Sequence, residues 1–272
     1  MLQEGWKEED PRSRRSGRLL PALAALTVAI AIAAPSTAVQ INSDRVVLPV
    51  VAHLPGHNGT QWRSDVWIQS PSSNVINLTL SYYPEAGGVL TATAHLDSYH
   101  AAYFHDIVFA TFGLDNSKGM LIVVADAPAV EVRARVYNTG NPDGEFGQAV
   151  PGLPLARLSR QGFLSGLTTA AGTRLSVGVA NPTDETYSVA VQVLDAVTRE
   201  KLTERLLEIG PHQLVQLDRV ADLWGLPARD AILVTVDSSE NTQFFYAYAS
   251  VVRNDTGDAT FIFGTSPNVG PQ

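Results

Sequence analysis

The sequence predicts an all-β protein in which two antiparallel β-sandwich domains follow one another along the chain. Two observations lead to this fold class: the second half of the chain repeats the first, and the repeated segments have the residue pattern of β-strands. The chain also begins with a stretch that has the features of an export signal. We therefore expect a signal segment at 1–38, sandwich domains at 46–151 and 161–264, a linker at 152–160, and a C-terminal tail at 265–272.

The first 38 residues have the features of a bacterial signal peptide. Four arginines within 12–18 precede the uncharged run 19–34, and small residues follow up to Ala38, where we expect cleavage. The uncharged run of ~16 residues is shorter than the ~20 that a membrane-spanning helix needs. An uncleaved N-terminal membrane anchor is the alternative, and the arginine pair leaves both the Sec and the twin-arginine export routes open.

An internal duplication is the main organising feature. Residues 63–71 align with 174–182, and residues 100–114 align without a gap with 212–226. Collinear similarity over about a hundred residues indicates two copies of one unit. Three polar pairs are shared by the copies in this alignment: Arg63 with Arg174, His100 with His212, and Asp106 with Asp218.

Most segments of each copy are predicted to be strands. Residues 75–83 and 187–195 alternate large apolar residues with smaller or polar ones, which is typical of a half-buried strand. Residues 120–125 and 231–236 are short apolar runs, and residues 244–249 are rich in aromatic β-formers.

The remaining regular structure in each copy is one short helical turn. Residues 107–112 and 220–224 are predicted to form these turns, with Asp106 and Asp218 as the N-caps. About seven strands in ~105 residues is the size of an immunoglobulin-like sandwich, although the disulfide and buried tryptophan of antibody domains are absent. The term therefore describes architecture only.

Composition excludes several classes of function. The chain of 272 residues has no cysteine, which rules out disulfides, thiolate metal sites, a cysteine nucleophile and a lipid anchor on cysteine. Its net charge of -8 argues against nonspecific nucleic-acid binding, because that requires a surplus of Lys and Arg. An acidic exported chain without cysteine fits a bacterial periplasm or exterior.

Several motifs resemble those of a group of exported bacterial proteins with tandem immunoglobulin-like β-sandwich repeats. Residues 48–56 (LPVVAHLPG) and 59–67 (GTQWRSDVW) look like the opening of that group. Residues 146–148, 248–252 and 255–258 are similar to its later motifs. The resemblance implies a secreted pair of sandwiches, and it implies no activity and no catalytic residues.

The densest group of possible metal ligands lies between residues 95 and 106. His95, Asp97 and His105 are the members without a counterpart in the second copy, so only this trio could form a site private to the first copy. Imidazole and carboxylate groups are suitable ligands for zinc and similar ions. We favour ordinary surface or capping histidines over a metal site, because such a site needs three ligands of well-defined geometry and strand alternation would point His100 and His105 to opposite faces.

Two further sets of residues are candidates for ligand binding. Arg63 could grip a ligand, but an arginine–carboxylate bridge inside each copy, Arg63 with Asp106 and Arg174 with Asp218, is the favoured interpretation. Aromatic side chains could form a platform for a sugar ring, although at strand spacing such residues usually belong to the core. These aromatic residues are Trp62, Trp67, Tyr82, Tyr83, Tyr99 and Tyr103. The ligand-binding candidates are therefore Trp62, Arg63 and Trp67.

These observations favour an exported, non-catalytic structural or binding module of the cell envelope or exterior, with a protein or a glycan as its ligand. The alternative is a metal-dependent or hydrolytic enzyme that uses His95, Asp97 and His105. A third possibility is assembly by strand addition at an exposed edge. No cofactor is expected, membrane contact is expected only through the signal or anchor segment, and no oligomeric state follows from the sequence.

Overall fold

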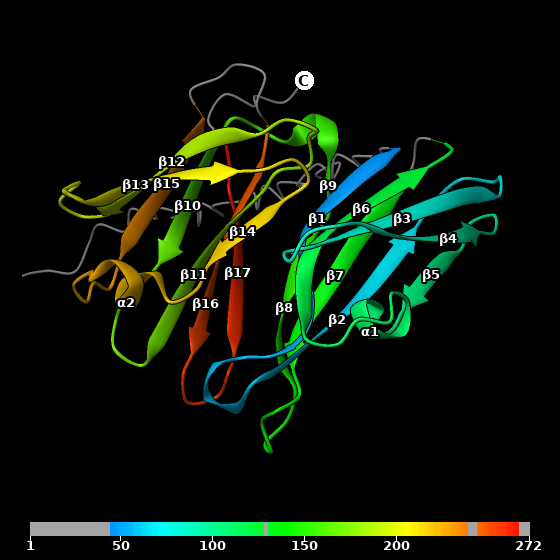
Figure 1. Ribbon diagram of the computed structural model, residues 1–272. Helices are drawn as coiled ribbons and strands as arrows, with labels where there is room; N and C mark the ends of the chain where they lie inside the picture. The colour runs from blue at the N-terminus through cyan, green and yellow to red at the C-terminus, as the bar shows by residue number, and fades with distance from the viewer. Residues whose placement is uncertain (1–43, 128–129, 239–243, 267–272) are drawn as a thin grey trace, which may run out of the picture. The chain divides into compact units, whose positions relative to one another are not determined.

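Strands that pair antiparallel make up most of the computed structural model, which describes residues 44–127, 130–238 and 244–266 (Figure 1). The all-β class and the sandwich architecture predicted from the sequence are therefore confirmed. The predicted signal segment at 1–38 lies outside the described residues. None of the helices in the described ranges has the length and apolar character needed to cross a membrane.

The first half contains two four-stranded layers joined through one long strand, β1 (Arg45–Pro55). One layer has the order β4-β3-β6-β1 and the other has the order β5-β2-β7-β8. β1 shifts register between Leu48 and Val51, and its last residues pair with β2, so the layers form one continuous sheet. The other strands are β2 (Gln61–Gln69), β3 (Ile76–Pro84), β4 (Leu90–Leu96), β5 (Ala101–Phe104), β6 (Ser117–Ala125), β7 (Glu131–Asn138) and β8 (Phe146–Pro151).

The second half has two separate sheets with the same strand order. One sheet has the order β10-β15-β12-β13, which corresponds to β1-β6-β3-β4 of the first half. The other has the order β14-β11-β16-β17, which corresponds to β5-β2-β7-β8. The strands are β10 (Gln161–Leu167), β11 (Thr173–Ala180), β12 (Tyr187–Asp195), β13 (Lys201–Ile209), β14 (Leu214–Leu217), β15 (Ile232–Ser238), β16 (Tyr246–Arg253) and β17 (Ala259–Phe263).

This order differs from that of an immunoglobulin domain. There the first strand lies beside the second, in sheets ABED and CFG, whereas β10 lies beside β15 and each sheet has four strands. The immunoglobulin-like part of the expectation therefore describes only the two packed antiparallel sheets. Domain length and turn spacing predicted the sandwich, but they do not specify which strands become neighbours.

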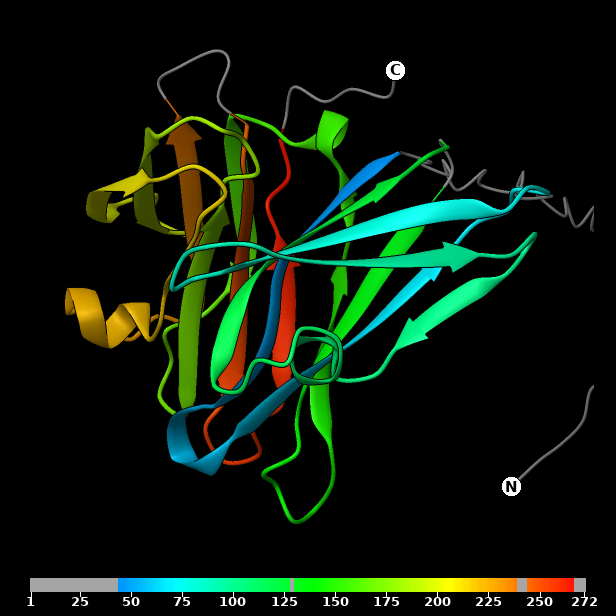
Figure 2. The same cartoon turned by 45° about the vertical axis from the view of Figure 1, so that its right-hand side comes forward.

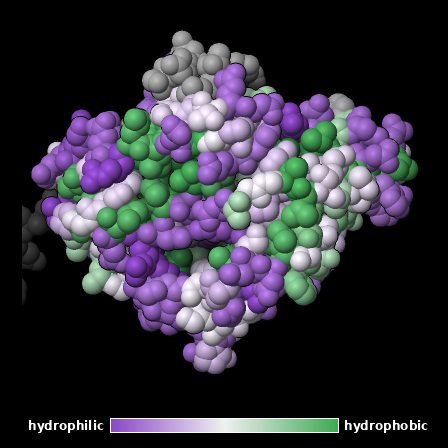
Figure 3. Space-filling view, in the orientation of Figure 1, coloured by the Kyte–Doolittle hydropathy of each residue, from purple (hydrophilic) through white to green (hydrophobic). Residues whose placement is uncertain are grey.

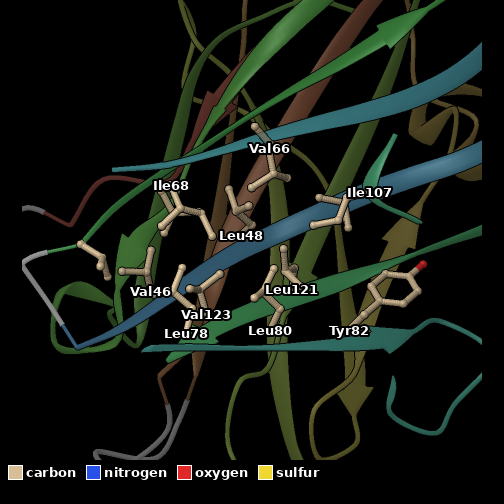
Figure 4. Packing of buried hydrophobic residues seen from close by; sticks show 14 of the residues in the cluster. Val46, Leu48, Val66, Ile68, Leu78, Leu80, Tyr82, Ile107, Leu121 and Val123 are labelled. Carbon is tan, nitrogen blue, oxygen red and sulfur yellow. The ribbon is translucent and has the colours of Figure 1, made fainter. Parts of the chain in front are cut away.

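Each half has its own apolar core between its two layers. Figure 4 shows the first core, where Val46, Leu48, Leu80 and Leu121 from one layer meet Val66 from the other. In the second core, β12 alternates buried and half-buried residues along its length, as its sequence predicts. Full burial of such a side chain contributes roughly 1.5–3 kcal/mol, so these cores supply most of the folding free energy.

A third apolar cluster joins the two halves. Val47, Met120 and Ile122 face away from the first core and pack with Tyr246 and Tyr248 of β16. Figures 1 and 2 show β16 and β17 beside the strands of the first half. The stretch predicted as a linker contributes to this cluster, because β9 (Leu153–Pro154) pairs with β1 and the turn η2 (Leu155–Arg157) is followed by buried Leu158.

The two predicted helical turns are present as α1 (Ile107–Ala110) and α2 (Val220–Trp224). Their capping differs from the prediction. The N-cap residues are Asp106 and Arg219, both with left-handed backbone angles, and neither side chain bonds to the helix. Asp106 is held by His53 instead, at 2.8 Å, so its carboxylate is not available to cap the turn.

Candidate functional site

His95, Asp97 and His105 lie at separate places in the first half. His95 is on the edge strand β4 opposite Asn77, Asp97 follows that strand, and both are exposed. His105 follows β5, where its Nδ1 lies 3.1 Å from Oδ1 of Asp65. Among residues 44–127, 130–238 and 244–266, no three His, Asp or Glu side chains are grouped closely enough to hold a metal ion. The structure does not assemble the trio that the alternative enzyme would require.

Strand register corrects two of the three repeat pairs. Ile68 of β2 and Val179 of β11 occupy equivalent positions in the sequence alignment. Ile68 pairs with Ala102, whereas Val179 pairs with Val215, which is one residue later than the gapless alignment requires. The residues that correspond in space are therefore His100 and Gln213, His105 and Asp218, and Asp106 and Arg219. The alignment matched identical side chains across a connection whose length differs by one residue.

Asp65 is the centre of a hydrogen-bond network on the outer surface of the β5-β2-β7-β8 layer, here named the open face. Its Oδ1 accepts from the backbone N–H of Asp106 at 2.9 Å and from the hydroxyl of Tyr137 at 3.1 Å. Its Oδ2 accepts from the hydroxyl of Tyr103 at 2.9 Å. The bond to Asp65 raises the pKa of Tyr103, and burial followed by the charge of Asp65 raises that of Tyr137.

The arginine–carboxylate bridge predicted for the first half is present. Nε of Arg63 lies 3.7 Å from Oδ2 of Asp106. The same carboxylate lies 2.8 Å from Nδ1 of His53, whose Nε2 is 3.2 Å from Asp115. Because Arg63 of β2 and His53 of β1 both contact the carboxylate of Asp106, the cluster ties β1, β2 and the residue before α1 together.

The corresponding bridge in the second half is absent, and the prediction of Arg174 with Asp218 is wrong. Oδ2 of Asp218 lies 3.1 Å from Nζ of Lys118, which comes from the first half. Its Oδ1 accepts from Gln216 at 2.6 Å and from Ser176 at 3.2 Å. Because Asp218 lies two residues before α2, whereas Asp106 lies directly before α1, its carboxylate reaches across to the other half.

Aromatic residues proposed as a platform are dispersed. Tyr82 is in the first core, and Tyr83 stacks on His212 between the halves. Trp67 stacks on Tyr103 on the open face, with ring centroids 5.1 Å apart. Of the three ligand-binding candidates Trp62, Arg63 and Trp67, Trp62 lines a pocket that the other two do not reach.

That pocket lies between the two halves and has a volume of about 410 Å³. One wall comes from the first half, including Trp62, Lys118 and Gln148. The opposite wall is the outer surface of the β14-β11-β16-β17 sheet, here named the covered face. Its polar lining residues are Arg174, Ser176, Gln216, Asp218, Tyr248 and Ser250. Figure 3 shows a hollow between the halves with hydrophilic residues around it.

Hydrogen bonds across and within the pocket hold its walls in place. Ser250 donates to Oε1 of Gln148 in the other half at 2.8 Å, and Tyr248 donates to Oε1 of Gln216 at 2.5 Å. Tyr248 lies across β11 at Gly178, where an added Cβ would be 2.2 Å from the ring. Burial raises the pKa of Tyr248 well above its usual value, so this phenol is neutral and acts as a donor.

Arg174 is the lining residue with the least complete set of partners. Its Nη1 donates to Oδ1 of Asn254 at 3.0 Å, whereas Nη2 is buried and has no hydrogen-bond partner among the described residues. Burial lowers the pKa of Arg174, and the nearby charge of Asp218 opposes this effect. An unpartnered guanidinium nitrogen is costly to bury, which makes this end of the pocket ready to bind an acceptor.

Sequence reasoning missed most of this site. Lys118 and Gln216 belong to no motif. Gln148 and Tyr248 lie in the motifs 146–148 and 248–252, but the resemblance that singled out those motifs gave neither residue a role. Arg174 and Asp218 were found through the repeat, but as an internal bridge. The pocket exists because one half packs against the other, and that packing leaves no pattern in either repeat alone.

Comparisons with known proteins do not identify a family. No family model matches the chain, and no curated protein matches it. The crystal structure of Thermotoga maritima 1070 matches with a TM-score of 0.35 and 7% identity, over 41% of this chain and 94% of that protein. A β-glucuronidase from glycoside hydrolase family 2 and a Bacteroides uniformis β-glucuronidase each match 80% of this chain with a TM-score of 0.16 and 10% identity. The chain spans 23% and 25% of those two enzymes. Similarities this low leave the pocket itself as the guide to function.

Proposed function

We propose that this protein is an exported, non-catalytic binding module that holds a small saccharide in the pocket between its two halves. The observation that carries the proposal is the pocket itself. Its volume of about 410 Å³ lies within the range of about 300–1,000 Å³ that is usual for small-molecule sites.

The chemistry of the lining fits a polyhydroxylated ligand. Amide, hydroxyl and carboxylate groups of Gln148, Gln216, Ser250 and Asp218 can accept from and donate to sugar hydroxyls. Trp62 supplies an aromatic surface for the apolar face of a sugar ring. All of these groups except Asp218 come from hydrogen-bonded strands on the two sides of the pocket, which favours binding without a large rearrangement.

We further propose that the two halves arose by duplication, that the protein is exported, and that it is related to the exported bacterial group whose motifs it resembles. The shared strand order of the two halves supports a duplication. The basic patch, uncharged run and small residues of 1–38 support export to the periplasm or exterior. We propose a non-catalytic role because His95 and Asp97, which the enzyme alternative needs, are on the surface and away from the pocket lining.

A glycan array followed by isothermal titration calorimetry tests this function. We expect the purified protein to bind a small saccharide, and we expect Trp62→Ala to lose binding while Trp67→Ala keeps it. Trp67 is the matched control, because it lies on the same strand β2 but on the open face. Loss of binding in Trp67→Ala alone would move the site to the open face, and no saccharide binding by the wild type would overturn the proposal.

A further inference from the structure

The cations that line the pocket differ in how their charge is compensated. Lys118 lies 3.1 Å from Asp218 and 3.6 Å from Glu85. Nε of Arg219 lies 3.7 Å from Asp222. Arg174 has no carboxylate within 4.0 Å among the described residues, and the side chain to which it donates, Asn254, is neutral. Among these three cations Arg174 is therefore the one without a salt bridge, and the charge of Asp218 acts on it only from a greater distance.

The equivalent arginine of the first half shows what Arg174 lacks. Arg63 donates from Nη1 to the carbonyl of Trp62 at 2.7 Å and lies 3.7 Å from the carboxylate of Asp106. In the second half the corresponding strand position keeps the arginine, but Arg219 stands where the first half has Asp106. The adjacent carboxylate of Asp218 is bound to Lys118 of the first half. Arg174 therefore lacks the counterion that Arg63 has, and it lies in the wall of a pocket.

We propose that Arg174 is an anion-binding residue and that the saccharide bound in this pocket carries a carboxylate. This inference rests on the proposed saccharide function and names the ligand class. A ligand carboxylate can pair with the guanidinium of Arg174, whose buried Nη2 has no hydrogen-bond partner among the described residues, and compensate its charge. Lys118 adds positive potential from the opposite wall, and its partner Asp218 can accept a hydrogen bond from a hydroxyl of the ligand.

A matched set of sugars tests the ligand class by calorimetry. The probes are D-galacturonate, its methyl ester and D-galactose, which differ only at the carboxyl carbon. We expect galacturonate to bind roughly 10- to 100-fold more tightly than the two neutral sugars, as is usual for a charge-assisted hydrogen bond. We also expect this preference to shrink as salt concentration rises.

Three variants assign the preference to one side chain. Arg174→Gln should bind all three sugars equally, and Arg174→Lys should keep part of the preference because it retains charge but loses the planar fork. Arg63→Gln is the matched control in the first half and should keep the full preference. If Arg174→Gln does not fold, the comparison of the three sugars on the wild type and on Arg174→Lys still decides the question.

A second probe separates this inference from the saccharide function. Sodium acetate is titrated against sodium chloride at constant ionic strength while the NMR signal of the Arg174 side chain is followed. Saturable acetate binding without any sugar binding would support the anion site and contradict the saccharide function. Equal affinity for galactose and galacturonate would overturn the anion site and leave the saccharide function standing. No response to acetate together with no preference among the sugars would also overturn it.

Discussion

The open face of the first half and the covered face of the second half are equivalent surfaces with opposite surroundings. On the open face, Trp67 of β2 pairs with Arg133 of β7, and both are exposed to solvent. On the covered face, the equivalent strand position is Gly178, which pairs with Tyr248 of β16 under the packed first half. The open face thus has a tryptophan where the covered face has a glycine. At Gly178 the ring of Tyr248, which packs against the first half, fills the space that a side chain would need.

Polar networks on the two faces differ in the same way. On the open face, the central carboxylate is Asp65 on the strand, and its partners all come from the first half. On the covered face, the strand residue is Ser176 and the carboxylate is Asp218 on the following loop, bound to Lys118 of the other half. A network that is closed within one copy stabilises that copy, whereas a network that crosses the interface builds a pocket.

Replacing Asp65 should have the largest effect on stability. Asp65→Ala leaves a buried backbone N–H and two tyrosine hydroxyls without their acceptor, and we expect a loss of about 3 kcal/mol in the free energy of unfolding. Ser176→Ala, at the equivalent position of the covered face, should cost about 0.5–1 kcal/mol. Urea unfolding of both variants measures the difference, and equal costs would show that Asp65 does not organise the open face.

Adding a methyl group at Gly178 should have the second largest effect. The new Cβ would lie 2.2 Å from the ring of Tyr248, and overpacking of this kind costs about 1–3 kcal/mol. Trp67→Phe, at the equivalent position of the open face, should cost less than about 1 kcal/mol, because the residue is 38% exposed and an aromatic ring is kept beside Tyr103. Thermal unfolding compares the two, and an unchanged melting temperature for Gly178→Ala would mean that the halves do not pack closely here.

Alkaline pH should destabilise the protein gradually through its buried tyrosines. Burial raises the pKa of Tyr82 to about 12 and raises that of Tyr246 further. Below pH ~10 both the folded and the unfolded states keep the phenol protons, so the stability is fully present. Above it the unfolded state releases them first, and the free energy of unfolding should fall by about 1.4 kcal/mol per pH unit for each such tyrosine.

The alkaline titration also separates the two faces. Tyr246→Phe on the covered face should flatten the dependence of the free energy of unfolding on pH between ~10 and ~12. Tyr103→Phe on the open face should change it less, because Tyr103 is 54% exposed and solvent screens the effect of Asp65 on its pKa. Urea unfolding across this pH range measures the slopes, and equal slopes for both variants would contradict the distinction between covered and open faces.

Local pattern was sufficient for the elements of the fold but not for their neighbours. The alternation in 187–195 predicts β12 with its bounds, because a strand with one buried face must place apolar residues at every second position. Similarly, the apolar run 120–125 falls within β6. The order of the strands within each sheet could not be predicted, since strands with similar apolar faces can be arranged in several orders.

The candidate site was predictable only in fragments. Trp62 was a candidate and does line the pocket, while Arg63 and Trp67 belong to the open face. The repeat drew attention to Arg174 and Asp218. The chain between β11 and β14 is one residue longer, relative to the alignment, than the chain between β2 and β5, so Asp218 does not occupy the position of Asp106. A slip of one residue matters because adjacent side chains of a strand point to opposite faces, so an alignment error of one position changes which side chains can meet.

The sequence by itself determined that this chain would form two layered β-sandwiches, because apolar periodicity of two and regular turn residues leave few other ways to bury its side chains. Only the tertiary structure decided that the covered face would lie against the first half. It also decided that Lys118 would form a salt bridge with Asp218, and that Arg174 would line a pocket without a partner for its Nη2 among the described residues. The physical reason is that these contacts join residues about a hundred positions apart, and their free energies depend on shape and charge at a surface that exists only after both sandwiches have folded.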